Sequence, residues 1–191
     1  MNRKGKLKRK TKETNVSIKI NLDGQGEAKT STGVKFLDHL LNTLVLHSCF
    51  DLELEANGDL QHHLIEDVAI CLGQALKEAM GKRENIKRFG YSIVPMDEAL
   101  VLSSVDLVRR AYSKIDLAFE RDKIEDTYVE DLIHFLNSLT SSAEITLHVK
   151  VIHGENDHHK AEACFKSLAL SLREALSTNS RGQAPSLKGV M

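Results

Sequence analysis

The sequence lacks tryptophan, has two prolines and three cysteines, and draws only 5% of its 191 residues from the aromatic types. An odd number of scattered cysteines argues against a disulfide framework and predicts a reducing compartment. No stretch approaches the roughly 18 apolar residues of a membrane span, and no signal-peptide segment follows the basic N-terminus. Since 26 basic residues oppose 27 acidic ones, the net charge of -1 attracts neither nucleic acid nor anionic lipid. We therefore expect a cytoplasmic protein with neither a nucleic acid nor a membrane as its partner.

What the chain does contain is enough apolar material for one compact folded unit, at 41% of its residues. Its first twelve residues include seven lysines and arginines. A nucleic-acid-binding arm is one interpretation of this charge, but no aromatic residues lie between the basic ones. We expect residues 1–12 to form a flexible basic tail exposed to water.

Alternation of apolar and polar residues predicts strands, whereas apolar residues three and four positions apart predict helices. The first two strands of the chain are expected to form a hairpin. In the first half, residues 13–80, we predict strands at 16–22, 27–30 and 50–56 and helices that begin at Phe36 and span 62–80. After a connector at 81–90, the second half is expected over 91–176, with strands at 91–94, 99–108, 112–119 and 145–151 and helices near 132–139 and 158–176. A tail follows at 177–191.

The two halves repeat each other in sequence. DHLLNTL around His39 matches IHFLNSL around His134, and the offset between the two histidines is 95 positions. HHLIEDVAICLGQALKEA from His62 matches HHKAEACFKSLALSLREA from His158, at an offset of 96. This tandem duplication predicts an α/β (α+β) fold of two ββαβα-like halves, with the helices packed between two antiparallel-rich sheets.

Six of the nine histidines occupy these repeated positions, together with two glutamates. The first histidine of each doublet lies four positions before a glutamate, so the two side chains share a helix face and can clamp one cation. A third imidazole can come from the shorter helix. The candidate metal ligands are His39, His62, His63, Glu66, His134, His158, His159 and Glu162.

The second histidine of each doublet points about 100° away from its neighbour on a helix, so it is expected to bind a different ion. We predict one site of His39, His62 and Glu66 completed by His159. The symmetry-related site combines His134, His158 and Glu162, and His63 completes it. Spacing alone does not decide whether this exchange occurs within one chain or between chains.

Other polar residues lie beside these ligands in the sequence. Asp67 and Asp157 are expected to orient imidazole rings as hydrogen-bond acceptors, although Asp157 has an equal claim as a helix cap. We give equal weight to two interpretations of His47, as a residue of the site and as a surface residue. His148 and His153 are assigned to the surface.

The segments FLDHLL, HHLIEDVAICLGQAL, MDEAL, GENDHHKAEACFK and PSLKGV together resemble the imidazoleglycerol-phosphate dehydratase family. This resemblance implies a ribosomal protein S5 domain 2-like fold, two manganese ions per active site, and a homo-oligomer of twenty-four subunits with active sites between chains. It places the metal ligands on the eight residues above. The positions it implies for substrate binding are Glu13, Arg88, Arg110, Ser186 and Lys188, with Arg88, Arg110 and Lys188 on the phosphate. We add His39 and His47 as further candidates for contact with the substrate. Arg109 is the alternative to Arg110.

The resemblance also implies a reaction, the dehydration of D-erythro-imidazole glycerol phosphate to imidazole acetol phosphate in L-histidine biosynthesis. The proton that is lost sits on a carbon with no adjacent carbonyl, so an electron sink is needed. Our hypothesis is that the metals hold the imidazole ring as an imidazolate that expels the hydroxyl and leaves a diazafulvene. Glu13 is the expected base, and Glu66 and Glu162 complete the catalytic carboxylates.

Two other functions fit parts of the pattern. A dinuclear metal phosphohydrolase also combines histidines, carboxylates and a phosphate clamp, but it usually has a carboxylate that bridges the ions. A protein of metal-dependent assembly or storage would explain the histidines and leave Arg88, Arg110 and Lys188 without a role. Phosphate release distinguishes the first alternative, and neutral replacement of the three cations tests the second.

Overall fold

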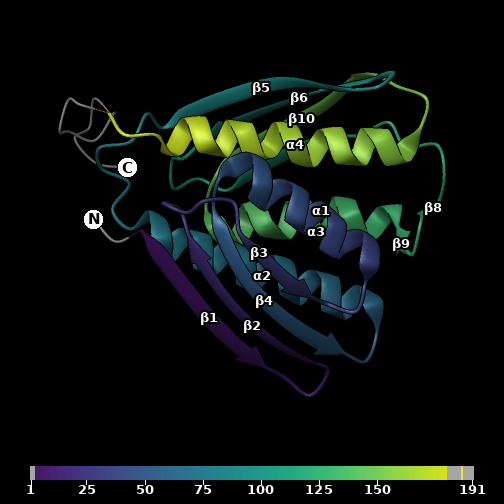
Figure 1. Ribbon diagram of the computed structural model, residues 1–191, viewed down its shortest axis with the longest axis horizontal. Coiled ribbons are helices and arrows are strands. Elements are labelled where there is room, and N and C mark those ends of the chain that lie inside the picture. The colour runs from purple at the N-terminus through teal and green to yellow at the C-terminus, as the bar shows by residue number, and fades with distance from the viewer. Residues whose placement is uncertain (1–2, 180–185, 187–191) are drawn as a thin grey trace.

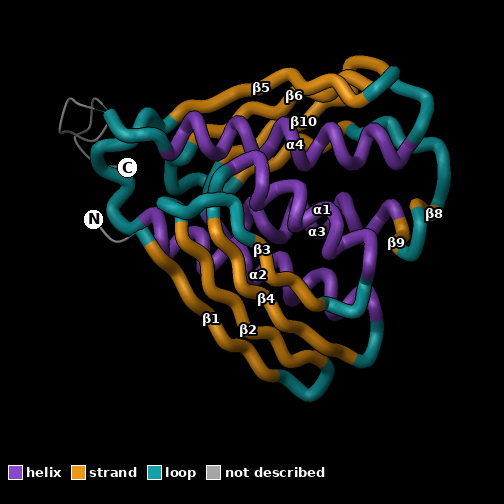
Figure 2. The backbone as a smooth tube through the Cα atoms, viewed as in Figure 1, coloured by secondary structure: helices purple, strands orange, loops and turns teal. Residues whose placement is uncertain are grey.

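The computed structural model describes residues 3–179 and residue 186. Within this part of the chain, two four-stranded sheets lie on the outside and four helices lie between them (Figure 1). Figure 2 shows that the strands form the two outer layers and that the helices fill the space between. The predicted sandwich of helices between two sheets is confirmed.

The first half contributes one sheet and two helices. Its strands are arranged in the order β1-β2-β4-β3, and β3 runs parallel to β4 while the other neighbours are antiparallel. The elements are β1 (Lys4–Lys10), β2 (Thr14–Asn21), β3 (Ala28–Ser31), α1 (Lys35–Ser48), β4 (Asp51–Gly58) and α2 (Gln61–Met80).

The second half repeats this arrangement with the strand order β5-β6-β10-β7 and a parallel pairing of β7 with β10. A two-stranded ribbon is inserted before its first helix. The elements are β5 (Phe89–Met96), β6 (Ala99–Asp106), β7 (Tyr112–Asp116), β8 (Lys123–Ile124), β9 (Thr127–Tyr128), α3 (Val129–Ala143), β10 (Thr146–His153) and α4 (Asp157–Leu176). Since the sheet order and the parallel edge strand recur, the duplication seen in the sequence is also a duplication of structure.

The helices of opposite halves pack directly on each other, α1 on α4 and α2 on α3. Alternating residues of the central strands, such as Ile18 and Leu54, are buried beneath them. At the contact of α2 with α3, a Cβ on Gly73 would lie 2.6 Å from the Cβ of Ser142 and 2.7 Å from the carbonyl oxygen of Leu139. The absence of a side chain at Gly73 therefore permits the close approach of these two helices.

The N-terminus differs from the prediction of a flexible basic tail. Residues Lys4–Lys10 form β1, which pairs antiparallel with β2 along its whole length. Gly5 allows the strand to lie against the backbone of α2, and Leu7 packs on the core. The four lysines of β1 stand at alternate positions and are exposed to water. This high content of exposed lysine is why composition alone suggested a tail. The first half is thus βββαβα and not ββαβα.

Three smaller predictions also need correction. The segment near 27–30 forms β3, which pairs with β4 and makes no hairpin with β2. The strand predicted at 112–119 ends at Asp116 as β7. The ribbon of β8 and β9 falls in a polar stretch that has no apolar alternation long enough to predict a strand.

None of the described helices combines the length and the apolar character needed to cross a membrane.

Candidate metal centre

Among the described residues, two sets of histidine and glutamate side chains bring their ligand atoms within 4.8 Å of one another. The first, called here the His39 group, contains His39, His158 and Glu162. The second, called the His62 group, contains His62, Glu66 and His134. Each set offers two imidazoles and one carboxylate, a donor combination suited to a divalent transition metal.

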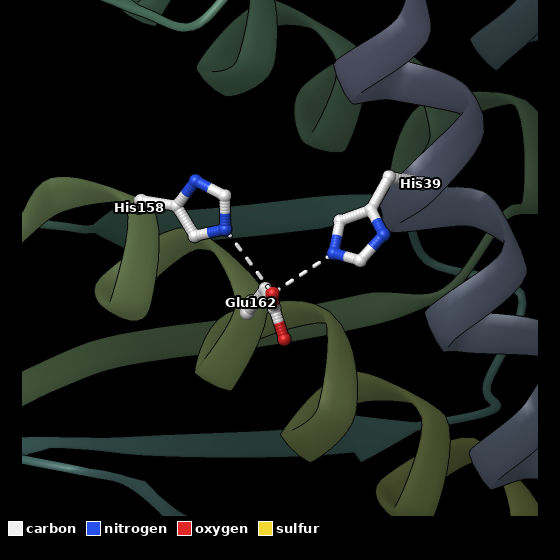
Figure 3. A group of neighbouring side chains, drawn as sticks. All are labelled: His39, His158 and Glu162. Carbon is white, nitrogen blue, oxygen red and sulfur yellow. Dashed lines mark hydrogen bonds and ion pairs between the residues drawn. The ribbon is translucent and has the colours of Figure 1, made fainter.

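The His39 group joins α1 to α4 (Figure 3). Glu162 Oε1 lies 2.8 Å from Nε2 of His39 and 3.2 Å from Nε2 of His158. The other oxygen, Oε2, pairs with Lys166 Nζ at 2.7 Å. Burial alone would raise the pKa of Glu162, but the hydrogen bonds from Lys166, His39 and His158 outweigh it and lower the pKa to about 2. Glu162 is therefore a carboxylate at any physiological pH.

The His62 group joins α2 to α3 in the same manner. His134 Nε2 lies 3.0 Å from Glu66 Oε1. The rings of His62 and His134 are stacked with their centroids 5.2 Å apart. This second group therefore reproduces the first in donor types, although it is more open to water, since 39% of the Glu66 side chain is exposed against 12% for Glu162.

A carboxylate holds Nδ1 of every histidine in the two doublets. The pairs are His62 with Asp131 at 2.5 Å, His63 with Asp59 at 3.1 Å, His158 with Glu125 at 3.1 Å and His159 with Glu98 at 2.7 Å. An imidazole in this position donates its Nδ1 hydrogen to the carboxylate, so Nε2 can bind a cation once it has lost its own hydrogen, which in His158 faces Glu162 Oε1. These partners therefore select the ring nitrogen, Nε2, that can bind a metal.

The two groups differ from the predicted combinations of ligands. His39 was expected with His62 and Glu66 of its own half, but it lies with His158 and Glu162 of the other half. The cause is the helix packing, because α1 contacts α4 and α2 contacts α3 across the pseudo-twofold axis. Sequence spacing cannot reveal which of two equivalent long helices lies beside each short one.

The second histidines of the doublets do not enter either group within this chain. His63 lies with Asp59 and Glu13, and its Nδ1 is 3.8 Å from Glu13 Oε2. His159 lies beside Glu98, with Asp97 at 3.6 Å. The hydrogen bonds that His63 and His159 donate to the carboxylates of Asp59 and Glu98, respectively, raise the pKa of the two imidazoles. The His63 and His159 side chains are 33% and 25% exposed, and Nε2 of His159 is the atom that lies 3.6 Å from Asp97 Oδ2.

Asp67 and Asp157 were expected to orient imidazoles, and the structure gives them other partners. Asp67 accepts hydrogen bonds from Arg9 and from the Thr14 hydroxyl. Asp157 forms a buried ion pair with Lys160 and accepts two backbone N–H groups of the loop before β8. The cap of α4 is Asn156, whose side chain accepts from the backbone N–H of His158. Neither of the two functions predicted for Asp157 is therefore found.

The carboxylates that do hold the imidazoles were missed from the sequence. Asp59 could have been found, since it lies four positions before His63. Glu98 stands in the MDEAL segment, although nothing in that segment shows its partner. Asp131 and Glu125 reach their histidines from other elements, and no local spacing signals such contacts.

Two further candidates lie near the groups. The backbone of Glu13 is fixed on both sides, because its N–H donates to Thr11 Oγ1 at 3.1 Å and its carbonyl accepts from Asp59 N at 3.0 Å. His47 lies in the last turn of α1, where burial and the nearby Lys166 lower its pKa while Glu162 opposes this effect. His47 is therefore a neutral imidazole on the side of the His39 group. His148 and His153 are exposed, as predicted.

Arg88, one of the predicted phosphate-binding residues, lies far from His158 of the same chain. The guanidinium of Arg88 forms two hydrogen bonds with the Asp106 carboxylate at 2.7 and 2.9 Å, and its backbone N–H donates to Ala175 near the end of α4. His158 lies at the start of that helix, about 25 Å away at 1.5 Å per residue. Figure 1 shows the length of this separation, because α4 begins on the right of the view and ends on the left, and α2 runs in the same direction.

The remaining members of this set are less fully placed. Arg110 is exposed, whereas Arg109 Nη2 donates to the carbonyl of Gly81 at 3.2 Å. This contact leaves Arg110 as the better candidate for a phosphate. Ser186 is half-buried, and Lys188 lies outside the described residues.

Comparison with known proteins gives a consistent result. The family model described as imidazoleglycerol-phosphate dehydratase matches residues 32–172. Proteins of that name from Dehalococcoides mccartyi and Clostridium botulinum are 44% and 46% identical to this chain, and each alignment covers at least 97% of both chains. A longer protein of that name from Phytophthora nicotianae is 47% identical over 99% of this chain, which spans 42% of its length.

Solved structures match as well. The imidazoleglycerol-phosphate dehydratase of Staphylococcus aureus superposes with a TM-score of 0.85 at 32% identity and covers 92% of this chain and 99% of its own. The Pyrococcus furiosus protein, solved in complex with a compound named (S)-C348, gives a TM-score of 0.84 at 38% identity, with 97% and 100% covered.

Proposed function

The chain belongs to the imidazoleglycerol-phosphate dehydratase family, and we propose that it removes water from D-erythro-imidazole glycerol phosphate to form imidazole acetol phosphate. It is a hydro-lyase of L-histidine biosynthesis that acts in the cytoplasm. The observation that carries this proposal is the pair of equivalent groups, each with two imidazoles and a carboxylate. Two similar sites are what a substrate with two ring nitrogens requires.

Each group fits a divalent cation but is incomplete in one chain. Three donors leave open positions on a six-coordinate ion. His63 and His159 belong to neither group of their own chain, and a carboxylate holds Nδ1 of each ring, so we assign their Nε2 atoms to groups of neighbouring copies. The proposed cofactor is two Mn²⁺ ions per active site. When bound, these ions would polarise the imidazole ring of the substrate and stabilise negative charge on it.

Glu13 is the proposed general base. Its carboxylate removes the proton from the carbon next to the one that loses hydroxide, and the enol then becomes the ketone. Because Glu13 lies beside His63 and its backbone is fixed by Asp59, it accompanies His63 into the centre formed with a neighbouring copy. The role of Glu13 and the assembly of the site are therefore linked.

The phosphate group is assigned to Arg88, Arg110, Ser186 and Lys188, and His47 is assigned to the substrate pocket. Asp106 orients the Arg88 guanidinium through two hydrogen bonds. Because Arg88 and His158 occupy opposite ends of α4, the phosphate and imidazole subsites must come from different chains. A homo-oligomer is thus part of the proposed function, and we propose the twenty-four-subunit assembly.

The phosphohydrolase alternative is less well supported by this geometry. Glu66 serves the His62 group and Glu162 serves the His39 group, so these carboxylates do not bridge the two groups. A two-metal hydrolase would hold its ions about 3.5 to 4 Å apart through such a bridge. Inorganic phosphate in the products would favour the hydrolase, and a ketone that retains its phosphate would exclude it.

The test is Glu13→Gln in the Mn²⁺-loaded protein. Loss of the base should lower kcat by at least about 100-fold, while the number of bound Mn²⁺ ions and the substrate affinity stay near those of the wild type. Glu27→Gln, a change of an exposed carboxylate outside both groups, is the matched control and should retain full turnover. Normal turnover by the Glu13 variant would remove it from the role of base.

A further inference from the structure

One short segment before α3 contacts the starts of the helices that carry both cation groups. The carboxylate of Asp126 accepts the backbone N–H of Lys35 at 2.8 Å and of Phe36 at 3.0 Å, the first residues of α1. The residue at the N-cap of α1 is Val34, whose side chain cannot accept a hydrogen bond. Asp126 thus caps α1 from 91 positions away in the sequence. One turn later, α1 carries His39.

The same residue also contacts the start of α2, the helix that carries His62 and Glu66. Its backbone carbonyl accepts from Gln61 Nε2 at 2.7 Å, and Gln61 is the first residue of α2, directly before His62. The N-cap of α2 is Leu60, again without a side-chain hydrogen bond. Gln61 and Asp126 therefore join the start of α2 to the start of α1.

The adjacent residue extends these contacts to α4, because Glu125 Oε1 lies 3.1 Å from Nδ1 of His158. Residues 125 and 126 thereby contact the starts of α1, α2 and α4, and α3 begins three residues later at Val129. Asp126 itself is half-buried. Burial raises its pKa and the backbone hydrogen bonds lower it, with a net decrease, so it caps α1 as a carboxylate.

We propose that Asp126 is a positioning residue that couples the two cation groups, so that occupation of one group orders the helix ends that carry the other. This inference rests on the proposed function, which makes both groups cation sites. A cation on His39 and His158 fixes α1 against α4, and Asp126 holds its position relative to α1. Through Gln61, the same residue then restricts α2 at His62. The second cation binds to a site that is already ordered and loses less conformational entropy.

The experiment is a titration of the metal-free, full-length protein with Mn²⁺, in which free Mn²⁺ is followed by its electron paramagnetic resonance signal. The wild type should bind two ions per chain with positive cooperativity. Asp126→Ala should weaken both binding steps by roughly tenfold and remove the cooperativity. Asp126→Asn keeps one oxygen acceptor and should recover part of the loss. The control is Asp122→Ala, which removes an exposed carboxylate of the same loop and should leave both steps unchanged.

A second set of variants separates coupling from local damage. Glu66→Gln disables the His62 group and leaves the His39 group to be titrated alone. In this background, Gln61→Ala should leave the affinity of the remaining site unchanged, whereas in the chain with both groups intact it should reduce the cooperativity. Circular dichroism would verify that each variant is folded.

The outcomes separate the inference from the function on which it rests. Wild-type binding of two ions together with unchanged binding in Asp126→Ala, or with a loss confined to one step, would overturn the coupling and leave the proposed function intact. Cooperativity that is unchanged in Gln61→Ala with both groups intact would also contradict the coupling. Failure of the wild type to bind Mn²⁺ would overturn both.

Discussion

At the scale of single residues, carboxylates decide which nitrogen of each doublet histidine is offered to a cation. Asp131, Glu125, Asp59 and Glu98 each hold one Nδ1 and leave one Nε2. The charge of the carboxylate also makes the ring a stronger electron donor. The affinity of these groups for a metal is therefore set in part by residues that do not touch it.

Asp131→Asn tests this role at the His62 group. The amide keeps the size of the side chain but loses the charge, so affinity for the cation of that group should fall about tenfold or more. Glu125→Gln is the matched change for the His39 group. In a calorimetric titration with Mn²⁺, the larger loss of affinity should fall on a different binding step in each of the two variants. Identical titration profiles would contradict the assignment of Asp131 to the His62 group and Glu125 to the His39 group.

A pH-dependent contribution to stability comes from Asp51 at the start of β4. Its carboxylate accepts the backbone N–H groups of Gln25 and Glu27 and the side-chain amide of Asn21, and hydrogen bonds of this kind, chiefly that of Gln25, lower its pKa. A lowered pKa gives stability that is present above the ordinary aspartate pKa and is lost as the pH falls through the folded value.

Asp51→Asn should consequently lower the free energy of unfolding by no more than about 1 kcal/mol at pH 7, since the carboxylate is in contact with water. The difference from the wild type should shrink as the pH falls below the ordinary pKa of aspartate. Urea denaturation at pH 7 and pH 3 measures this difference in the free energy of unfolding. An equal difference at both values would show that ionisation of Asp51 contributes nothing.

At the scale of elements, the sequence predicted what is periodic and missed what depends on packing. The alternation of Val16, Ile18 and Ile20 predicted β2, because one face of that strand is buried. The four lysines of β1 carry no such pattern, and its place in the sheet depends on Gly5, which fits against α2. The repeated histidines were evident from spacing, but their combination into groups required knowing that α1 packs on α4.

Gly73→Ala tests the contact between α2 and α3. The added Cβ would collide with Ser142 and Leu139, so the two helices must separate, at a cost of about 1–3 kcal/mol in the free energy of unfolding. Gln74→Ala, the next position on α2 and exposed, should be neutral or slightly stabilising because alanine favours helix. Guanidinium denaturation of both variants gives the comparison, and equal stabilities would mean that the contact yields without strain.

At the scale of the whole molecule, the proposed active site is divided between chains. The two groups have three donors each, and His63, His159 and Glu13 lie outside both groups of their own chain. If cations join donors of different chains, the free energy of metal binding is also free energy of assembly. The sequence supported this conclusion through the doublets, since adjacent helical residues cannot bind one ion, but the count of subunits came from family resemblance alone.

Removal of the cations should therefore break up the oligomer. We expect sedimentation velocity to show a large particle with Mn²⁺ and smaller species after chelation, with recovery when Mn²⁺ is restored. Elemental analysis of the same samples gives the ions bound per chain. His63→Ala and His159→Ala should remain small even with Mn²⁺, and a chelator-treated protein that keeps its full size would show that assembly does not depend on the metal.

The length of α4 has a genetic consequence. Because Arg88 and His158 stand at opposite ends of that helix, an allele defective in Arg88 and another defective in His158 would damage different portions of the proposed composite centre. Mixed particles made from the two would contain some centres built entirely from intact portions. A cell that carries both alleles should then grow without added histidine, although neither allele supports growth when it is expressed by itself.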